Sequence, residues 1–276
     1  MDKLLTLREY LNEYKKIAIA YSGGVDSTFL MKFATEILGK DNVLGINISS
    51  SLQTKRERSL LIDLNANENF NVVSQLIDEL NIPGLVENTS NRCYYCKKAI
   101  FENIFSIANK HGYKYVFDGT NADDIDDFRP GMKALRELGV ISPLKECGLN
   151  KDDIRKYSKD LNLITHDIPS SACIASRIPY ETKITKENLK QVELAEDLLF
   201  QLGYTGFRVR YHDSIARIEL KEQDMIPFIE NHRVEVYESF KRIGFTFVTL
   251  DIIGYRMGSQ NELLSEKEKG EVNYHE

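Results

Sequence analysis

Short apolar segments alternate with longer amphipathic ones in the first half of the chain. Four apolar segments of strand length lie at 16–21, 42–48, 71–77 and 114–120. Apolar residues recur at helical spacing from Asp26 to Gly39 and again from Cys96 to Lys110. A further helix is expected after Asn150, where Asp153 stands at the spacing of a helix cap. This alternation predicts an α/β fold with a parallel sheet wrapped by helices.

The pattern changes near residue 180. It then predicts a long helix, a strand, a second helix and a last strand, at 186–202, 207–212, 223–243 and 245–251. We therefore expect two domains, an α/β domain over 1–180 and a smaller α+β domain over 181–276. We expect the tail beyond residue 265 to be mobile.

Composition narrows the function classes. The 276 residues are 42% hydrophobic and 28% charged, which is ordinary for a globular protein. No apolar segment approaches a membrane span and no secretory signal is apparent, so we expect a cytoplasmic protein with reduced thiols and no membrane partner. A net charge of −6 disfavours a nucleic-acid surface, whereas a small anionic substrate could still bind in a local basic pocket.

The segment "KIAIAYSGGVDST" carries the strongest chemical signal. A buried strand leads into a loop and directly into a helix, and the predicted anion-binding residues of the loop are Ser22, Gly23, Gly24, Asp26, Ser27 and Thr28. Two glycines let the backbone approach an anion, which exposed N–H groups and the helix dipole would hold. Asp26 could bind a Mg²⁺ ion that bridges phosphates. An ordinary capped strand–helix junction is the alternative, and no lysine of the Walker type is present.

The motif SGGVDS after a first strand resembles the signature of the PP-loop ATP pyrophosphatases. The resemblance implies an adenine nucleotide α hydrolase-like domain that binds ATP and Mg²⁺ and cleaves ATP between its α and β phosphates. "DGTNADD" (118–124) resembles the second nucleotide loop of that superfamily, which implies ATP contacts from Gly119 and Asp123. Carboxylates in such a loop can also be merely solvated.

Within that superfamily the chain resembles the LarE family over nearly its whole length. The resemblance rests on "AYSGGVDSTFL", "NRCYYCKKAIF", "DGTNADDIDDFRPGMKALRELGVISPL", "ACIASRIPY", "RVRYHDSIARIEL" and "LDIIGYRMGSQNE". It implies an ATP-dependent sulfur insertase in nickel-pincer cofactor synthesis. Such an enzyme adenylates a carboxylate of a pyridinium dicarboxylate mononucleotide and replaces oxygen by sulfur.

Cys93 and Cys96 form a C-x-x-C pair in a chain with four cysteines. A closed zinc site would need further ligands from separate segments, because Cys147 and Cys173 stand alone and no histidine pair has metal-ligand spacing. A redox dithiol or two buried thiols are further readings. Cys147 has no partner at ligand spacing and is interpreted as incidental.

The LarE resemblance gives these cysteines a more specific role. In one kind of LarE protein a lone cysteine at the position of Cys173 gives up its own sulfur and becomes dehydroalanine. In the other kind a C-x-x-C pair joins that cysteine to hold a [4Fe–4S] cluster, whose open iron carries an extra sulfide. Cys93, Cys96 and Cys173 together imply the cluster-dependent kind. Cys173 lies near the expected domain boundary, where we expect a substrate cleft.

Arginines of the second half are predicted to bind an anionic substrate. Phe207, Val209 and Tyr211 alternate with Arg208, Arg210 and His212, which predicts a half-buried strand with one basic face. The substrate of the LarE family carries carboxylates and a phosphate, which implies contacts from arginines, and the candidates are Arg208, Arg210, Arg256 and Arg177. The alternative is a solvated face balanced by Glu219.

Glu196 and Arg129 are further candidate site residues. Glu196 could serve as a catalytic acid or base or as an arginine partner, although its pattern is that of a carboxylate on a helix surface. Arg129 also stands in a segment that carries the resemblance.

The predicted function is therefore ATP-dependent sulfur transfer, with a small-molecule nucleotide substrate, sulfide or another sulfur donor, and a homo-oligomeric state. The alternatives are a sacrificial transferase that uses the sulfur of Cys173, and an ammonia-using synthetase of the NAD synthetase type. A tRNA thiolase is disfavoured by the acidic charge. A non-catalytic nucleotide sensor would bind ATP without releasing pyrophosphate.

Overall fold

The computed structural model describes residues 2–50, 52–125, 130–168, 172–256 and 258–263. The chain forms two compact units. The first comprises Met1–Ile82 and Cys93–Ser171, and the second comprises Pro83–Arg92 and Ala172–Glu276. Among the described residues no helix is long and apolar enough to cross a membrane.

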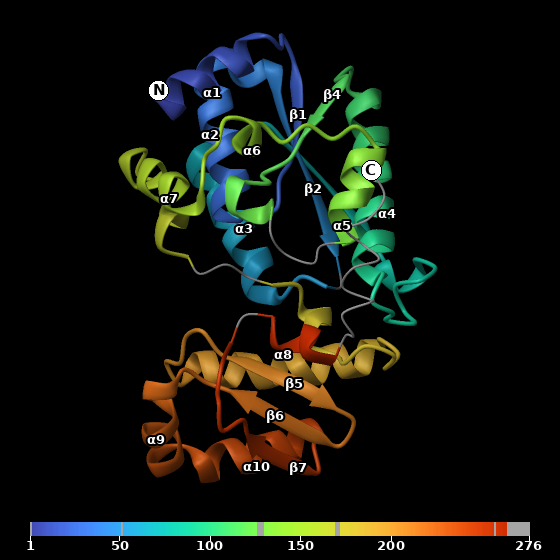
Figure 1. Cartoon of the computed structure of the whole chain (residues 1–276), viewed down its shortest axis with the longest axis vertical. Coiled ribbons are helices and arrows are strands. Elements are labelled where there is room, and N and C mark those ends of the chain that lie inside the picture. Colours follow the sequence, from blue (N-terminus) through green and yellow to red (C-terminus); the bar gives the residue numbers. More distant parts are fainter. Residues whose placement is uncertain (1, 51, 126–129, 169–171, 257, 264–276) are drawn as a thin grey trace. The chain divides into compact units, whose positions relative to one another are not determined.

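The first unit alternates strands and helices (Figure 1). Its strands are β1 (Ile17–Ala20), β2 (Val43–Ser50), β3 (Val72–Ile77) and β4 (Tyr115–Phe117). Its helices are α1 (Lys3–Asn12), α2 (Val25–Leu38), α3 (Lys55–Glu68), α4 (Arg92–Lys110), α5 (Pro130–Glu137), α6 (Pro143–Glu146) and α7 (Lys151–Asp160). These elements confirm the predicted α/β fold. Helix α4 begins at Arg92 rather than at Cys96, so both cysteines of the C-x-x-C pair lie inside it.

The four strands form a parallel sheet in the order β3-β2-β1-β4. Strand β1 is buried on both faces: Ile17 and Ile19 pack into one hydrophobic core, and Ala18 packs into the other. Such a strand needs an apolar residue at every position, which explains the continuous run "IAIA". The chain extends the sheet to one side of β1 and then crosses to β4 on the other side, so the strand order reverses at the β1–β4 pair.

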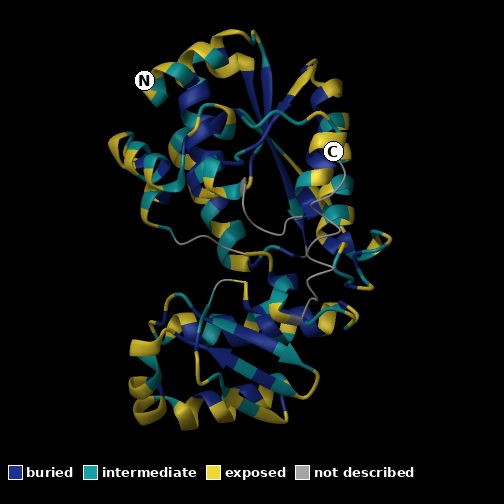
Figure 2. Cartoon of the chain, in the orientation of Figure 1, coloured by how far each residue is buried: buried dark blue, intermediate teal, exposed yellow. Residues whose placement is uncertain are grey.

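The second unit has a three-stranded sheet in the order β5-β6-β7 (Figure 1). Its elements are α8 (Lys186–Gln201), β5 (Arg208–His212), β6 (Ile215–Glu219), α9 (Glu222–Asn231), α10 (Arg233–Ile243) and β7 (Phe247–Leu250). Strands β5 and β6 are antiparallel, whereas β6 and β7 are parallel. The apolar face of the sheet packs with α8 and α10 into a separate core (Figure 2).

Two features of the second unit differ from the expectations. The single helix predicted over 223–243 is wrong, because the helix breaks at His232, whose φ of −123° lies outside the helical range. Residues Pro83–Arg92 also belong to this unit, where the buried Asn88 donates to the carbonyls of Pro179 and Thr182.

Candidate functional site

The loop between β1 and α2 has the geometry of an anion-binding loop. Gly23 has a φ of +79°, and a Cβ there would lie 2.9 Å from Leu61 Cδ1, so this position strongly favours glycine. The Ser22 and Ser27 hydroxyls lie 3.1 Å apart, and Ser27 donates to the Gly24 carbonyl at 3.2 Å. Gly24 caps α2 without a side chain, so no side chain covers the first N–H groups of that helix.

The segment 118–124 lies directly beside this loop. A Cβ on Gly119 would stand 2.9 Å from the Ser27 amide nitrogen, and Asn121 Nδ2 lies 3.4 Å from Asp26 Oδ1. Buried Asp118 shapes the segment by accepting hydrogen bonds from the Thr120 and Ser142 hydroxyls. Both loops follow the carboxyl ends of neighbouring strands at the point where the strand order reverses, which is the usual ligand position in such sheets.

A lysine that sequence reasoning missed also lies at this edge. Lys151, the first residue of α7, places its amine in an ion pair with the Asp26 carboxylate, and its backbone N–H donates to Asp123 Oδ2 at 2.8 Å. Burial raises the pKa of Asp26, while Lys151 and Asn121 lower it. The lysine therefore compensates a partly buried carboxylate and adds a cation next to the loop.

The predicted nucleotide-binding residues differ in their exposure to solvent. Ser22, Gly24 and Asp123 are exposed and Asp26 is half-buried, so an incoming nucleotide could reach them. Ser27 is almost fully buried, and Thr28 is completely buried within α2. A phosphate contact of the Thr28 hydroxyl therefore stays a prediction to which the geometry lends no support.

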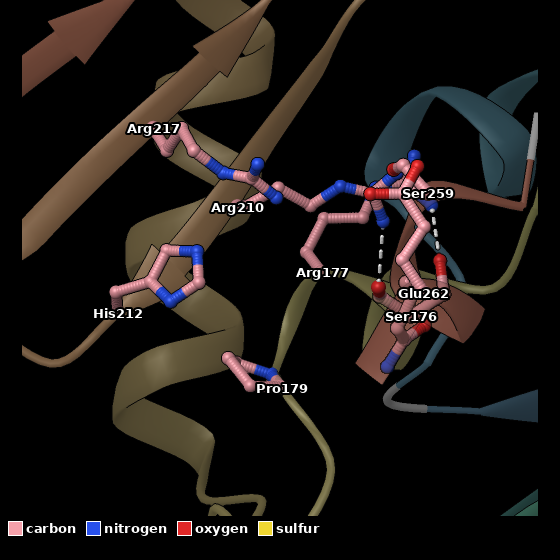
Figure 3. A pocket seen from close by; sticks show the side chains of 9 residues that line it. Ser176, Arg177, Pro179, Arg210, His212, Arg217, Ser259 and Glu262 are labelled. Carbon is pink, nitrogen blue, oxygen red and sulfur yellow. Dashed lines mark hydrogen bonds between the residues drawn. The ribbon is translucent and has the colours of Figure 1, made fainter. Parts of the chain in front are cut away.

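The second unit contains an arginine-rich pocket of about 230 Å³ (Figure 3). Two predicted substrate residues, Arg177 and Arg210, line it. Sequence reasoning missed Arg217, whose side chain alternates with the core residues of β6 just as Arg210 does on β5. The remaining lining residues are Ser176, Pro179, His212, Ser259, Gln260 and Glu262.

Arg210 is already engaged by neighbours. Its guanidinium contacts both carboxylate oxygens of fully buried Glu219, at 3.1 and 2.9 Å, and also the Ser176 carbonyl and the Ser259 hydroxyl. Glu219 therefore balances the charge of Arg210, as expected. This part of the strand face is buried, however, and not solvated.

Arg208 differs from Arg210 in its partners. Its guanidinium lies over the Tyr255 ring at 5.0 Å, and among the described residues no carboxylate forms an ion pair with it. Burial lowers the pKa of Arg208, and neighbouring Arg177 lowers it further. A half-buried cation without a carboxylate partner gains from an incoming anion.

Glu196 is buried, although its spacing in the sequence is that of a carboxylate on a helix surface. Its carboxylate accepts two hydrogen bonds from Arg177, at 2.8 and 3.0 Å, and a third from the Val209 amide at 3.1 Å. Both side chains of the ion pair are 4% exposed. The arginine-partner reading is confirmed. Arg256 instead forms ion pairs with Glu262 and Asp251, and Arg129 lies outside the described residues.

All four cysteines are reduced thiols. Cys93 is exposed and Cys96 half-buried, in the first turns of α4, and exposed Cys173 directly precedes the short 3₁₀ helix Ile174–Arg177 of the second unit. Half-buried Cys147 has a pKa raised to about 11 by burial and by Glu146. Among the described residues no three His, Cys, Asp or Glu side chains gather as a metal site.

Comparisons with known proteins agree with this geometry. The NAD synthase family model matches residues 2–104. The chain is 38% identical to an uncharacterized protein of Synechocystis sp., over 96% of the chain and 98% of that protein. It is 34% identical to an uncharacterized protein of Methanocaldococcus jannaschii, over 93% and 98%. It is 37% identical to the pyridinium-3,5-bisthiocarboxylic acid mononucleotide synthase of Lactiplantibacillus plantarum, over 95% of each protein. Two loops meet where the order of the parallel strands reverses. This geometry and these identities show that the chain is a PP-loop enzyme of the LarE family.

Proposed function

We propose that this enzyme uses ATP to replace a carboxylate oxygen of a pyridinium dicarboxylate mononucleotide by sulfur. The relative from Lactiplantibacillus plantarum is named for the synthesis of a bisthiocarboxylic acid mononucleotide, which supports the substrate class and the reaction. The PP-loop family uses ATP and Mg²⁺. The pairing of the two loops at the end of β1 and β4 is the observation of this chain that carries the proposal.

The first step is adenylation of the substrate carboxylate. A carboxylate oxygen attacks the α phosphorus of ATP, the bond to the β-phosphate oxygen breaks, and pyrophosphate leaves. Ser22, the backbone of Gly23 and Gly24, and the Lys151 amine supply donors where negative charge builds on phosphate. Asp26 and Asp123 would hold Mg²⁺, for which carboxylate oxygens are suitable ligands.

The second step is displacement of AMP by sulfur. A sulfide attacks the adenylated carbon, the bond from that carbon to the AMP oxygen breaks, and a thiocarboxylate forms. AMP is a far better leaving group than the oxygen of a free carboxylate, which explains why ATP is consumed.

Arginines of the second unit would hold the anionic substrate. Arg208 has no carboxylate partner among the described residues and is the best candidate for a phosphate or carboxylate contact. Arg177, Arg210 and Arg256 are anchored by carboxylates, so we assign them to shaping the pocket and to supporting contacts.

Cys93, Cys96 and Cys173 fit a [4Fe–4S] cluster by their donor chemistry, because all three are unoxidised thiols and none is fully buried. Such a cluster, when bound, would supply sulfide to the reaction. The protein's part is to provide three thiolates and leave one position without a protein ligand. Cys147 is left out of this set because it has no partner at ligand spacing, and burial and Glu146 raise the pKa of its thiol, which disfavours the thiolate.

Anaerobic purification with iron and sulfide analysis tests the cluster. We expect about four iron atoms per chain, lost in Cys93→Ala and kept in the control Cys147→Ala. Stoichiometric zinc in their place would contradict it. Full thiocarboxylate formation without iron, together with loss of sulfur from Cys173, would instead support the sacrificial alternative.

A further inference from the structure

Arg208 is held in place by an aromatic ring and not by a carboxylate. Its guanidinium carbon lies 5.0 Å from the centre of the Tyr255 ring, and among the described residues its one hydrogen bond goes to the Phe207 carbonyl, at 2.6 Å. The face of such a ring attracts a cation, and a planar guanidinium stacks well on it. The contact therefore orients the guanidinium without neutralising its charge.

The other predicted substrate arginines are each oriented by at least one carboxylate. These ion pairs are Arg177–Glu196, Arg210–Glu219 and Arg256–Glu262. An anion that approaches such an arginine must displace the carboxylate or share the guanidinium with it. A guanidinium that rests on a ring keeps most of its five N–H donors for the incoming anion.

A tight turn after β7 brings the Tyr255 ring to this position. Asp251 Oδ1 accepts hydrogen bonds from the N–H groups of Ile253 and Gly254, at 2.9 and 3.2 Å. Gly254 has a φ of +77°, and a Cβ there would collide with the Leu220 carbonyl oxygen. The Tyr255 N–H then donates to that same carbonyl at 2.7 Å. The backbone on the near side of the ring is thus fixed by the turn.

The strand register explains why this turn ends beside Arg208. Arg208 is opposite Glu219 in the β5–β6 pair, and Leu220 is the next residue of the chain. A tyrosine that is hydrogen-bonded to Leu220 therefore lies at the end of the sheet where Arg208 begins β5. Arg208 and Tyr255 are both half-buried, so the pair stays in reach of a small solute.

We propose that Tyr255 is a positioning residue for substrate binding, which holds the Arg208 guanidinium in the orientation that binds an oxyanion of the mononucleotide. The proposal rests on the proposed function, in which Arg208 contacts a phosphate or a carboxylate of the substrate. Tyr255 itself does not touch the substrate, and its effect passes entirely through Arg208.

A double-mutant cycle on the full chain tests this coupling. Dissociation constants of the mononucleotide and of inorganic phosphate are measured by calorimetry without ATP, for the wild type, Tyr255→Leu, Arg208→Gln and the double variant. We expect Tyr255→Leu to weaken binding about 3- to 30-fold, the range for loss of one cation–π contact. In the Arg208→Gln background the same change should alter binding by less than about twofold, because the cation that the ring holds is gone.

Tyr255→Phe separates the role of the ring from that of the hydroxyl. It should bind both anions as the wild type does, because the ring face is kept. Thermal melting shows whether each variant folds. If Tyr255→Leu lowers the melting temperature, Tyr255→Met takes its place in the cycle, since a flexible unbranched side chain fills the space without a ring face.

Tyr115→Leu is the matched control. Tyr115 begins β4 in the first unit, and its ring also carries a cation, because Lys114 Nζ lies 5.4 Å from its centre. The variant should bind both anions normally. The affinity for ATP should be the same in every variant, because the predicted ATP residues belong to the first unit.

The dephosphorylated nucleoside identifies the anion. A loss with the mononucleotide alone would place Arg208 on the phosphate, and an equal loss with the nucleoside would place it on a carboxylate. Coupling that appears with inorganic phosphate in a chain that does not bind the mononucleotide would support the positioning role and contradict the proposed function. Equal losses from Tyr255→Leu with and without Arg208, Tyr255→Phe as weak as Tyr255→Leu, or no coupling with either probe would overturn the proposal.

Discussion

The amine of Lys151 forms an ion pair with the carboxylate of Asp26, across 125 positions of the sequence. This pair joins the start of α7 to the loop that follows β1. We therefore expect the Lys151 amine to contact a phosphate of a nucleotide bound at this loop.

Replacing Lys151 should therefore impair adenylation. We expect Lys151→Met to lower the rate of pyrophosphate release about 100- to 1000-fold, the range for loss of one preorganised donor to transition-state charge. Lys159→Met, at an exposed position of the same helix, should leave the rate unchanged. Equal rates for both variants would show that Lys151 has only a structural role.

Gly119 should be essential for the close approach of the two loops. A Cβ there would lie 2.9 Å from the Ser27 amide nitrogen and 3.2 Å from Asp26 Cβ, and backbone cannot yield as a flexible side chain can. We expect Gly119→Ala to destabilise the fold by about 1–3 kcal/mol and to weaken ATP binding, by calorimetry. Gly24→Ala is the stability control, because its Cβ would find nothing nearer than 3.5 Å. Identical melting temperatures would refute this argument.

Glu196→Gln tests whether that carboxylate is structural or catalytic. The substitution leaves Arg177 buried without its counter-charge, so we expect a loss of about 3–5 kcal/mol in the free energy of unfolding. Glu187→Gln, exposed in the first turn of the same helix, should cost less than about 1 kcal/mol. A Glu196→Gln enzyme of unchanged stability that had lost only the chemical step would favour the acid–base role instead.

Cys147 should react slowly with alkylating reagents. Its pKa of about 11 lies above the ordinary thiol value, so the thiol stays protonated until the pH rises through that range. At pH 8 roughly one thiol in a thousand is ionised, and labelling should rise about tenfold per pH unit up to pH 10. Peptide mass spectrometry can compare it with exposed Cys93. A labelling rate for Cys147 that stayed flat across this range would contradict the raised pKa.

The sequence predicted the nucleotide loop and the strand–helix alternation well, because both depend on local signals. The SGGVDS motif and the apolar run of β1 are each recognised from a few consecutive residues. The break at His232 was missed because the apolar period continues from α9 into α10.

The roles of residues whose partners lie far away in the sequence could not be predicted from the local sequence pattern. Lys151 resembles an ordinary lysine after the Asn150 cap, and only the fold brings it to Asp26. Glu196 has the spacing of a surface carboxylate, yet it is buried because Arg177 and the Val209 amide compensate it. A capped helix that directly follows a loop was the only available hint for Lys151.

The most direct test of sulfur insertion is an anaerobic multiple-turnover assay with ATP, the pyridinium dicarboxylate mononucleotide and isotopically heavy sulfide. We expect heavy sulfur in a thiocarboxylate product, one AMP and one pyrophosphate for each sulfur inserted, and an intact Cys173 after many turnovers. A product that carries only light sulfur from a Cys173 converted to dehydroalanine would contradict the cluster-based account. Release of AMP without any thiocarboxylate would contradict sulfur transfer itself.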